Sequence, residues 1–527
     1  MAGADFLQLD PAHAPAGGLT AWLAEAVRGA VSDSRLVPGD RLPATRVLAE
    51  QLGCSRGVVV DAYRRLTDEG LLAGRRGGGT TVRAAWATAS GSGAPARGPG
   101  TAPAARPPSS GLAGGLPGLF APGDPSGPGG PGGPGAPGAA GTDLIDLSPG
   151  LPDLSAFPRA AWARAERAAL DGLASRDLGY GDPRGLPALR EALAGWLART
   201  RGLPAHPDDI LVVNGVSQGL MLLARALVAR GTTRIGFEDP GSYGAREHLR
   251  RWDLAPVPVP VDGHGLDVAA LDRSGVDAVL VTPAHQFPTG VVLAPGRRRA
   301  LVAWARSGAV PGPDGLPGRL VIEDDYDAEH RYDRPPVPAL RALAPEHVVH
   351  LGSVSKTLAP GIRIGWLLAP AALRSELVEA RYWTDLAGPA LPQLALAHFI
   401  TSGGFERHLR QVRRRHRARR DALLAALATH LPGATAHGVA AGLHLLVTLP
   451  GVDDADLARR AAAAGVRVHP LSAHRVGDGP PGLVIGYAAN PPDRLAEAVT
   501  RIADAVAGTT AVGSHRGCDG TPGGAGI

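Results

Sequence analysis

The chain has 527 residues, of which 44% are hydrophobic, and a formal net charge of +5 at pH 7. This length allows two to four domains and a large buried core. No apolar run is long and uncharged enough to span a bilayer, the first residues lack the basic segment of a secretory signal, and the two cysteines cannot form a disulfide framework, so we expect a cytoplasmic protein.

The first segment with a folded composition, residues 11–83, has the pattern of a helix-turn-helix followed by a wing. Two short strand-like runs on either side of a glycine run predict a two-stranded wing over residues 71–82. Helical apolar spacing predicts three helices, over residues 20–30, 45–52 and 55–69.

This segment is basic, because eight arginines oppose four acids between Arg41 and Arg83. Neutralisation of phosphates supplies much of a protein's affinity for DNA, and the second helix of such a motif enters the major groove. The order of residues from Leu42 through Thr80 resembles the GntR winged helix-turn-helix almost end to end. A helical protein-interaction domain is the alternative. Together, position and resemblance give these candidates for DNA contact: Arg41, Thr45, Arg46, Ser55, Arg56, Arg75 and Gly77.

The rest of the chain divides by composition. Residues 84–142 are almost all Gly, Pro, Ala and Ser, which predicts a disordered linker. From residue 143 to residue 507 apolar strands alternate with helical segments, which predicts an α/β domain. A smaller loop is expected over residues 311–318, and a disordered Gly-rich tail over residues 508–527.

Lys356 is the only lysine in the chain. Arginine replaces lysine in most surface roles, but a guanidinium cannot form an imine, whereas a lysine amine can hold an aldehyde as a Schiff base. An apolar run that predicts a buried strand precedes Lys356, and Ser353 and Arg363 flank it at spacings that could hold a phosphate. This segment resembles the cofactor-lysine motif of fold-type I pyridoxal-phosphate (PLP) enzymes.

The other supports that PLP needs have candidates in the same domain. Asp324 ends a predicted strand at a spacing that suits the pyridine nitrogen, and Tyr326 can donate to the ring oxygen; a divalent metal site is the alternative for this acidic run. Tyr243 is the candidate ring-stacking aromatic, and His285 or Gln286 could bond near the ring oxygen.

A predicted strand-Gly-helix turn at Val216 and Ser217 would complete a phosphate cup with backbone N–H groups.

The whole arrangement resembles the MocR/GabR family, in which a GntR-type DNA reader precedes an aminotransferase-like domain. The most specific segments are residues 283–290, 323–332 and 353–366. The resemblance implies PLP held by Lys356 as an aldimine, an amine or amino-acid effector or PLP itself as the signal, and an operator in double-stranded DNA. It also implies a homodimer in which Tyr180 reaches the partner's phosphate site.

One departure from the family concerns the arginine that grips a substrate carboxylate near the C-terminal strand. That strand, residues 482–488, contains no arginine, so Arg246 and Arg475 are the candidates for effector binding. No metal is expected. A true aminotransferase with an appended DNA module is the second hypothesis, and a DNA-binding protein whose large domain is only a scaffold is the third.

Overall fold

The computed structural model describes residues 9, 11, 14–15, 18–32, 36, 39–68, 71–75, 79–82, 144–308, 318–333 and 337–513. These residues belong to two compact units, Met1–Asp124 and Pro125–Ile527. The expected linker over residues 84–142 lies outside the described residues, as does nearly all of the expected loop over 311–318.

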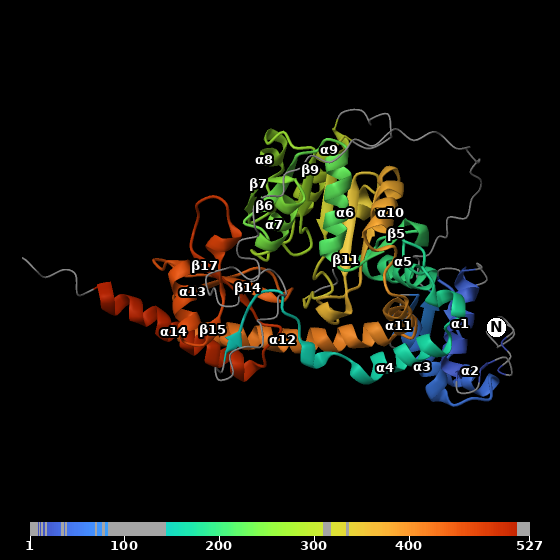
Figure 1. The fold of residues 1–527 in the computed structure, drawn as a ribbon. Helices are drawn as coiled ribbons and strands as arrows, with labels where there is room; N and C mark the ends of the chain where they lie inside the picture. The colour runs from blue at the N-terminus through green and yellow to red at the C-terminus, as the bar shows by residue number, and fades with distance from the viewer. Residues whose placement is uncertain are drawn as a thin grey trace, which may run out of the picture. The chain divides into compact units, whose positions relative to one another are not determined.

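The first unit contains three helices and a small sheet (Figure 1). The helices are α1 (Leu19–Ser32), α2 (Thr45–Gln51) and α3 (Arg56–Asp68), and the strands are β1 (Arg41–Leu42), β2 (Leu72–Arg75) and β3 (Gly79–Val82). β3 pairs antiparallel with both β2 and β1. The three predicted helices and the wing are confirmed, and the structure adds the two-residue strand β1, which no sequence pattern had indicated. Each helix contributes apolar side chains to one core, for example Leu23, Leu48 and Leu66.

The second unit is built on an eight-stranded sheet with the order β5-β12-β11-β10-β9-β6-β7-β8. The five consecutive strands in the middle of this order, β11-β10-β9-β6-β7, are parallel to one another. β12 is antiparallel to both β11 and β5, and β8 is antiparallel to β7. The strands are β5 (Ile210–Val213), β6 (Arg234–Asp239), β7 (Ala255–Asp262), β8 (Gly265–Leu266), β9 (Ala278–Val281), β10 (Leu320–Asp324), β11 (Val348–Ser353) and β12 (Gly365–Leu368).

Helices cover both faces of this sheet (Figure 1), which is why its strands are apolar throughout. In β5, Ile210 and Val212 face one layer and Leu211 and Val213 face the other. α6, α7 and α10 pack on the second face, and α5, α8, α9 and α11 on the first. These helices are α5 (Pro187–Arg201), α6 (Val216–Ala229), α7 (Tyr243–Arg251), α8 (Val268–Arg273), α9 (Pro295–Arg306), α10 (Ala371–Asp385) and α11 (Ala390–Thr401), with α4 (Arg159–Asp171) packed on α11.

The second unit also contains a smaller, four-stranded sheet of order β13-β14-β17-β16. Its strands are β13 (Thr435–His437), β14 (His444–Thr448), β16 (His469–Pro470) and β17 (Gly482–Gly486), and β15 (Val466–Arg467) pairs in parallel with β4 (Ile145–Asp146). α13 (Asp454–Ala463) and α14 (Pro492–Gly513) share its core. Because α14 runs to Gly513, the expectation of a disordered tail is wrong for residues 508–513; residues 514–527 lie outside the described residues.

The 27-residue helix α12 (Gly404–His430) joins the two sheets of the second unit (Figure 1). Phe405 and Leu409 near its start belong to the core beside the large sheet, whereas Leu423 and Leu427 near its end belong to the core of the small sheet. Among the described residues, no helix is both long and apolar enough to cross a membrane.

Candidate functional site

The candidate site of the second unit lies at the carboxyl ends of β10 and β11, where open α/β sheets place their ligands. β10 ends at Asp324 and β11 at the buried Ser353. The Nζ atom of Lys356 donates to the carbonyl oxygen of Gly150 at 2.7 Å. Burial lowers the pKa of the Lys356 amine, and the charges of Asp324 and Asp327 oppose that shift. A lowered pKa increases the fraction of nucleophilic neutral amine.

Asp324 carries the observation that tests whether PLP fits this site. Its side chain is half-buried overall, but its Oδ1 atom is buried and has no hydrogen-bond partner among the described residues. Burial of the carboxyl, together with the charges of Asp325 and Asp327, raises the pKa of Asp324 to about 7. A cationic N–H donor at this oxygen would relieve both effects, and the protonated pyridine nitrogen of PLP is such a donor. The residues present therefore fit the cofactor.

The neighbouring acids of the same run have other partners. Asp325 accepts hydrogen bonds from Nε and Nη2 of the buried Arg201 at 2.6 and 2.9 Å. Glu323 accepts from the backbone N–H groups of Leu340 and Arg341 at 2.6 and 3.0 Å. These contacts fix the end of β10 and occupy two of the acids that could otherwise have formed the divalent metal site considered as the alternative from the sequence. Nothing in the sequence indicated Arg201 as the partner of Asp325, because the two residues lie 124 positions apart.

A hydrogen-bonded cluster surrounds the phenol of Tyr326. His285 Nδ1 lies 3.1 Å from the hydroxyl of Tyr326 and 2.8 Å from Oδ2 of Asp327. Gln286 turns away, because its Nε2 donates to the carbonyl of Pro240 at 2.9 Å. Burial and the Asp327 charge raise the pKa of Tyr326, which keeps the phenol a hydrogen-bond donor. Of the two candidates for the ring-oxygen region, the structure therefore places His285 beside Tyr326.

A cup suited to a phosphate lies at the start of α6. Gly215 has φ of 82° and caps the helix, so the N–H groups of Val216 and Ser217 begin its first turn. The guanidinium of Arg363 donates to the carbonyl of Asn214. A Cβ atom at Gly215 would lie 3.2 Å from Nη2 of Arg363, so glycine permits the arginine to lie close to the turn.

The remaining candidates differ in their surroundings. Tyr243 begins α7, and the Arg246 guanidinium carbon lies 5.4 Å from the centre of its ring. Arg475 Nη2 donates to the carbonyl of Pro480 at 3.0 Å, so this arginine is engaged by its own loop. Tyr180 is 91% exposed and lies on the surface of the unit.

Two buried histidines, one of which contacts the backbone of Lys356, were not identified from the sequence. His330 Nε2 donates to the backbone carbonyl of Lys356 at 3.1 Å, and the His330 ring lies 5.0 Å from that of His416. Burial lowers the pKa of His330 to about 4, so the ring is neutral near pH 7. No spacing in the sequence could have signalled these residues, because their partners are distant in the chain.

In the first unit, the candidate arginines lie on the surface. Arg46 and Arg56 are exposed in the first turns of α2 and α3, where a helix-turn-helix presents side chains to DNA. Arg41 is exposed on β1 and its side chain lies over Gly79, where a Cβ atom would come within 2.9 Å of the Arg41 Nε.

The other candidates for DNA contact are only partly described. Thr45 begins α2 and is half-buried, and the exposed Ser55 immediately precedes α3. Arg75 ends β2, but its side chain lies outside the described part of the chain, as does the whole of Gly77.

A winged helix-turn-helix unit and an aminotransferase-type α/β unit in one chain define the class of DNA-binding regulators with an aminotransferase-like domain. Residues 19–82 match the family of bacterial regulatory proteins, gntR family, and residues 142–502 match aminotransferase class I and II. The chain belongs to the GntR-type transcriptional regulators that carry this aminotransferase domain.

Similar proteins cover nearly the whole chain. The HTH-type pyridoxine biosynthesis transcriptional regulator PdxR of Corynebacterium glutamicum is 33% identical, over 92% of this chain and 95% of that protein. The probable rhizopine catabolism regulatory protein MocR of Rhizobium meliloti is 32% identical over 92% of each. Among solved structures, the multiple substrate aminotransferase of Thermococcus profundus superposes with a TM-score of 0.64 at 27% identity, over 71% of this chain and 93% of that one.

Proposed function

We propose that this regulator is controlled through PLP bound at Lys356. The observation that carries the proposal is the sole lysine of the chain, which follows β11, beside the end of the neighbouring strand β10. There a buried carboxyl oxygen of Asp324 has no hydrogen-bond partner among the described residues. When bound, PLP supplies an aldehyde that links covalently to a lysine amine and a ring that withdraws electrons. In this proposal Asp324 would hold the ring nitrogen and Tyr326, with His285, the ring oxygen.

The other groups of the site have corresponding roles. Val216, Ser217, Ser353 and Arg363 would hold the phosphate, since backbone N–H groups and a guanidinium are its usual donors. Tyr243 would lie against the ring.

In the first unit, Arg46 and Arg56 would contact the operator from the helix starts, where both are exposed. Arg41, Thr45, Ser55, Arg75 and Gly77 complete the proposed DNA contacts. We place the protein in the cytoplasm, where its DNA lies.

The signal in this proposal is an amine or amino acid, or PLP itself. A ligand shifts the regulator only if it binds one arrangement of the chain better than another. Of the two arginines suggested for effector binding, Arg246 is better placed because Arg475 is engaged by its own loop.

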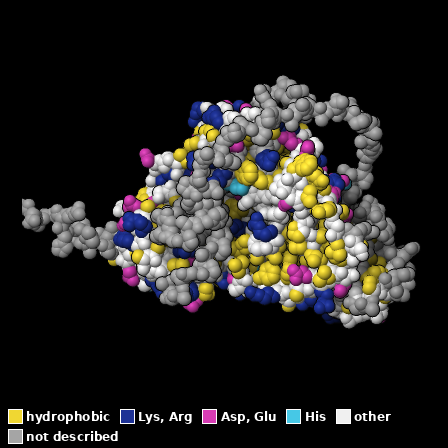
Figure 2. Space-filling model, in the orientation of Figure 1, with side chains coloured by type: hydrophobic (Ala, Val, Ile, Leu, Met, Phe, Trp, Pro, Cys, Tyr) yellow, Lys and Arg dark blue, Asp and Glu magenta, His cyan; other side chains and the backbone are white. Residues whose placement is uncertain are grey.

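A second copy of the chain is proposed as the partner. Large apolar side chains are exposed around the loop of Tyr180 and the end of α10, including Trp383 at 75% exposure and Leu386. A Cβ atom at Gly181 would lie 4.0 Å from Ala387, so the two segments are neighbours. Figure 2 shows hydrophobic side chains gathered where Figure 1 places α5, α10 and α11. An exposed apolar patch of this kind is typical of a protein interface.

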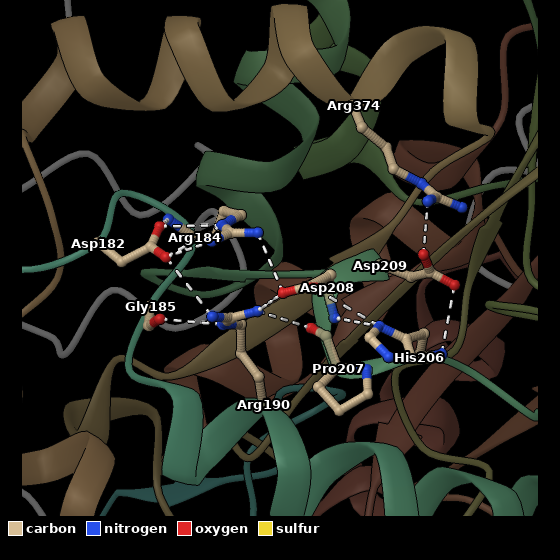
Figure 3. A network of polar contacts seen from close by, with 9 residues as sticks. All are labelled: Asp182, Arg184, Gly185, Arg190, His206, Pro207, Asp208, Asp209 and Arg374. Atoms are coloured by element: carbon tan, nitrogen blue, oxygen red, sulfur yellow. Dashed lines mark hydrogen bonds and ion pairs between the residues drawn. The ribbon is translucent and has the colours of Figure 1, made fainter. Parts of the chain in front are cut away.

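A polar network holds the loop that carries Tyr180 in place (Figure 3). Arg184 pairs with Asp182 at 2.7 Å and with Asp208 at 3.0 Å. The buried Arg190 pairs with Asp208 at 2.7 Å and lies 3.5 Å from Asp182. A fixed, exposed tyrosine suits the role of reaching a partner's phosphate site.

The test uses the purified full chain and its visible spectrum. Wild-type protein supplied with PLP and then dialysed should stay yellow, and Lys356→Ala and Lys356→Arg treated in the same way should be colourless, the second because arginine keeps the charge but forms no imine. Colour that persists unchanged in both variants would overturn the proposal.

An active aminotransferase with an appended DNA module is the alternative function, and the solved aminotransferases that share the fold of the second unit give it weaker support, because they match only about 70% of this chain. Multiple turnovers of amino-acid and keto-acid pairs at ordinary enzyme rates would support that alternative. Binding of DNA that responds to an amine without such turnover would support regulation.

A further inference from the structure

A polar network holds the turn that begins α6, and its central residue is Asn214, between β5 and α6. The backbone N–H of Asn214 donates at 2.8 Å to Oε1 of Gln218, which lies in the first turn of α6. The carbonyl of Asn214 accepts from the guanidinium of Arg363. The side-chain Nδ2 of Asn214 donates to Oδ2 of Asp385 at 2.9 Å. Asn214 therefore connects the arginine proposed for the phosphate with the start of α6 and with a carboxylate on another helix.

That carboxylate belongs to Asp385, the last residue of α10, and it accepts from three donors. Its Oδ2 atom accepts from Asn214, from Nε2 of Gln218 at 2.9 Å and from Nη1 of Arg381 at 2.8 Å. Asp385 lies 171 positions from Asn214 and 167 from Gln218, so no local pattern in the sequence could have indicated these contacts. The carboxylate fixes how the start of α6 lies against the end of α10.

Arg381 holds this carboxylate from one turn earlier in α10. Its side chain is fully buried, and its Nη1 donates both to Asp385 and to Oε1 of Gln218. Burial lowers the pKa of Arg381, and the charge of Asp385 opposes that shift. A Cβ atom at Gly388 would lie 3.1 Å from Nη2 of Arg381, so the loop after α10 packs closely on the guanidinium. Close packing and a buried ion pair together keep the two side chains in one geometry, because either charge alone would be costly to bury.

The groups held by this network are the ones proposed to bind the cofactor phosphate. Backbone N–H groups bind a phosphate only when the helix start directs them at it, and a guanidinium does so best in a fixed orientation. Gln218 fixes the turn through the N–H of Asn214, and the carbonyl of Asn214 holds Arg363. A displacement of the start of α6 would therefore misdirect the N–H groups of Val216 and Ser217 together with the arginine.

We propose that Asp385 and Arg381 are positioning residues for the phosphate of the cofactor. They act through the side chains of Asn214 and Gln218, and neither is assigned a contact with the cofactor itself. The inference rests on the proposed function, because it requires a phosphate-bearing cofactor in the cup. Its consequence is that the buried pair determines how strongly the site prefers an aldehyde with a phosphate over the same aldehyde without one.

A role limited to the packing of α10 on α6 is the competing interpretation, and a second ion pair between these helices separates the two. Arg230, just after the last turn of α6, donates through Nε to Glu376 of α10 at 2.8 Å. This pair joins the same helices at the other end of the 14-residue α6, about 20 Å from the cup. If the pairs served helix packing alone, their removal would affect cofactor binding alike.

The experiment titrates the full chain with PLP and with pyridoxal, which has the same aldehyde and no phosphate, and follows the yellow colour formed at the sole lysine. Wild-type protein should bind PLP more tightly than pyridoxal. Arg381→Met combined with Asp385→Leu removes both buried charges, so neither is left unpaired. This double variant should lower the ratio of the two affinities about tenfold or more, through weaker binding of PLP, because charge-assisted hydrogen bonds to the phosphate are lost.

The matched control is Arg230→Met with Glu376→Leu, which should keep the wild-type ratio. If circular dichroism shows that the Arg381 and Asp385 double variant is unfolded, Asn214→Ala decides in its place, because it leaves the ion pair intact and should lower the ratio by a smaller factor. A ratio that is unchanged in the deciding variant, or lowered equally in the control, would overturn the inference. Wild-type protein that turns yellow with neither aldehyde would instead count against the proposed function, and equal affinity for both would count against its phosphate cup.

Discussion

Asp324 is the proposed partner of the cofactor ring, and its buried charge destabilises the folded protein when no cofactor is bound. A carboxyl whose folded pKa, about 7, exceeds its unfolded value binds its proton more tightly in the folded state. Its contribution therefore favours folding at low pH and is lost as pH rises from about 4 to about 7. The same buried charge is what a cationic ring nitrogen would neutralise.

We predict that Asp324→Asn stabilises the cofactor-free protein relative to wild type at pH 8 and not at pH 4, because the amide is neutral at both. The substitution should at the same time reduce retention of PLP, since the ring nitrogen loses its anionic partner. Thermal unfolding at the two pH values and the yellow absorbance after dialysis measure the two effects. Asp478→Asn, at an exposed position, is the control and should change neither.

The buried pair of Arg201 and Asp325 leads to a second prediction at this scale. Removing one partner leaves the other charge buried and unpaired, which costs about 3–5 kcal/mol, whereas removing both is far less costly. Arg201→Met should therefore lower the free energy of unfolding by that amount, and Arg201→Met with Asp325→Leu should recover most of it. Urea unfolding curves measure both, and a single variant as stable as wild type would contradict the buried-pair account.

At the scale of elements, the exposed end of α10 and the loop of Tyr180 form the surface that we assign to a second copy of the chain. Trp383→Glu or Leu386→Glu should shift the protein from dimer toward monomer, because an unpaired carboxylate in an apolar interface is strongly disfavoured. Sedimentation equilibrium measures the shift. Leu343→Glu, also at an exposed leucine, is the control. An unchanged mass in both interface variants would rule out this surface as the dimer contact.

Elements and strand ends could be predicted from the sequence because their signals are local. Apolar periodicity located α1, α2 and α3, and an acid or a lysine directly after an apolar run located Asp324 and Lys356. What could not be predicted depends on contacts between distant segments. The choice between His285 and Gln286 is decided by Pro240, which lies 46 residues from Gln286. The contact of Arg246 with the backbone carbonyl of Ala473 joins segments 227 residues apart. The two-residue strand β1 exists only because β3 lies beside it.

At the scale of the whole molecule, the two units give one chain both a DNA reader and a ligand-binding domain. We predict that Arg56→Ala weakens binding to a DNA duplex of arbitrary sequence and reduces the slope of log affinity against log salt by about one, because one phosphate contact is lost. Fluorescence anisotropy at several salt concentrations measures the slope. Arg225→Ala, an exposed arginine of α6, should leave it unchanged. If both variants alter the slope alike, the reader does not make this contact.

The helix α12 has a mechanical consequence for how a ligand could be sensed. It is about 40 Å long, and its two ends are embedded in different cores. Between those ends, Arg415 and Arg419 both pair with the buried Asp153, at 2.6 and 2.9 Å. A continuous α-helix resists bending more than the loops around it do. The small sheet can therefore tilt against the large one only if the side chains that pack on α12 roll or slide along it. A movement of one sheet caused by ligand binding would therefore reach the other sheet as a rotation about the axis of α12.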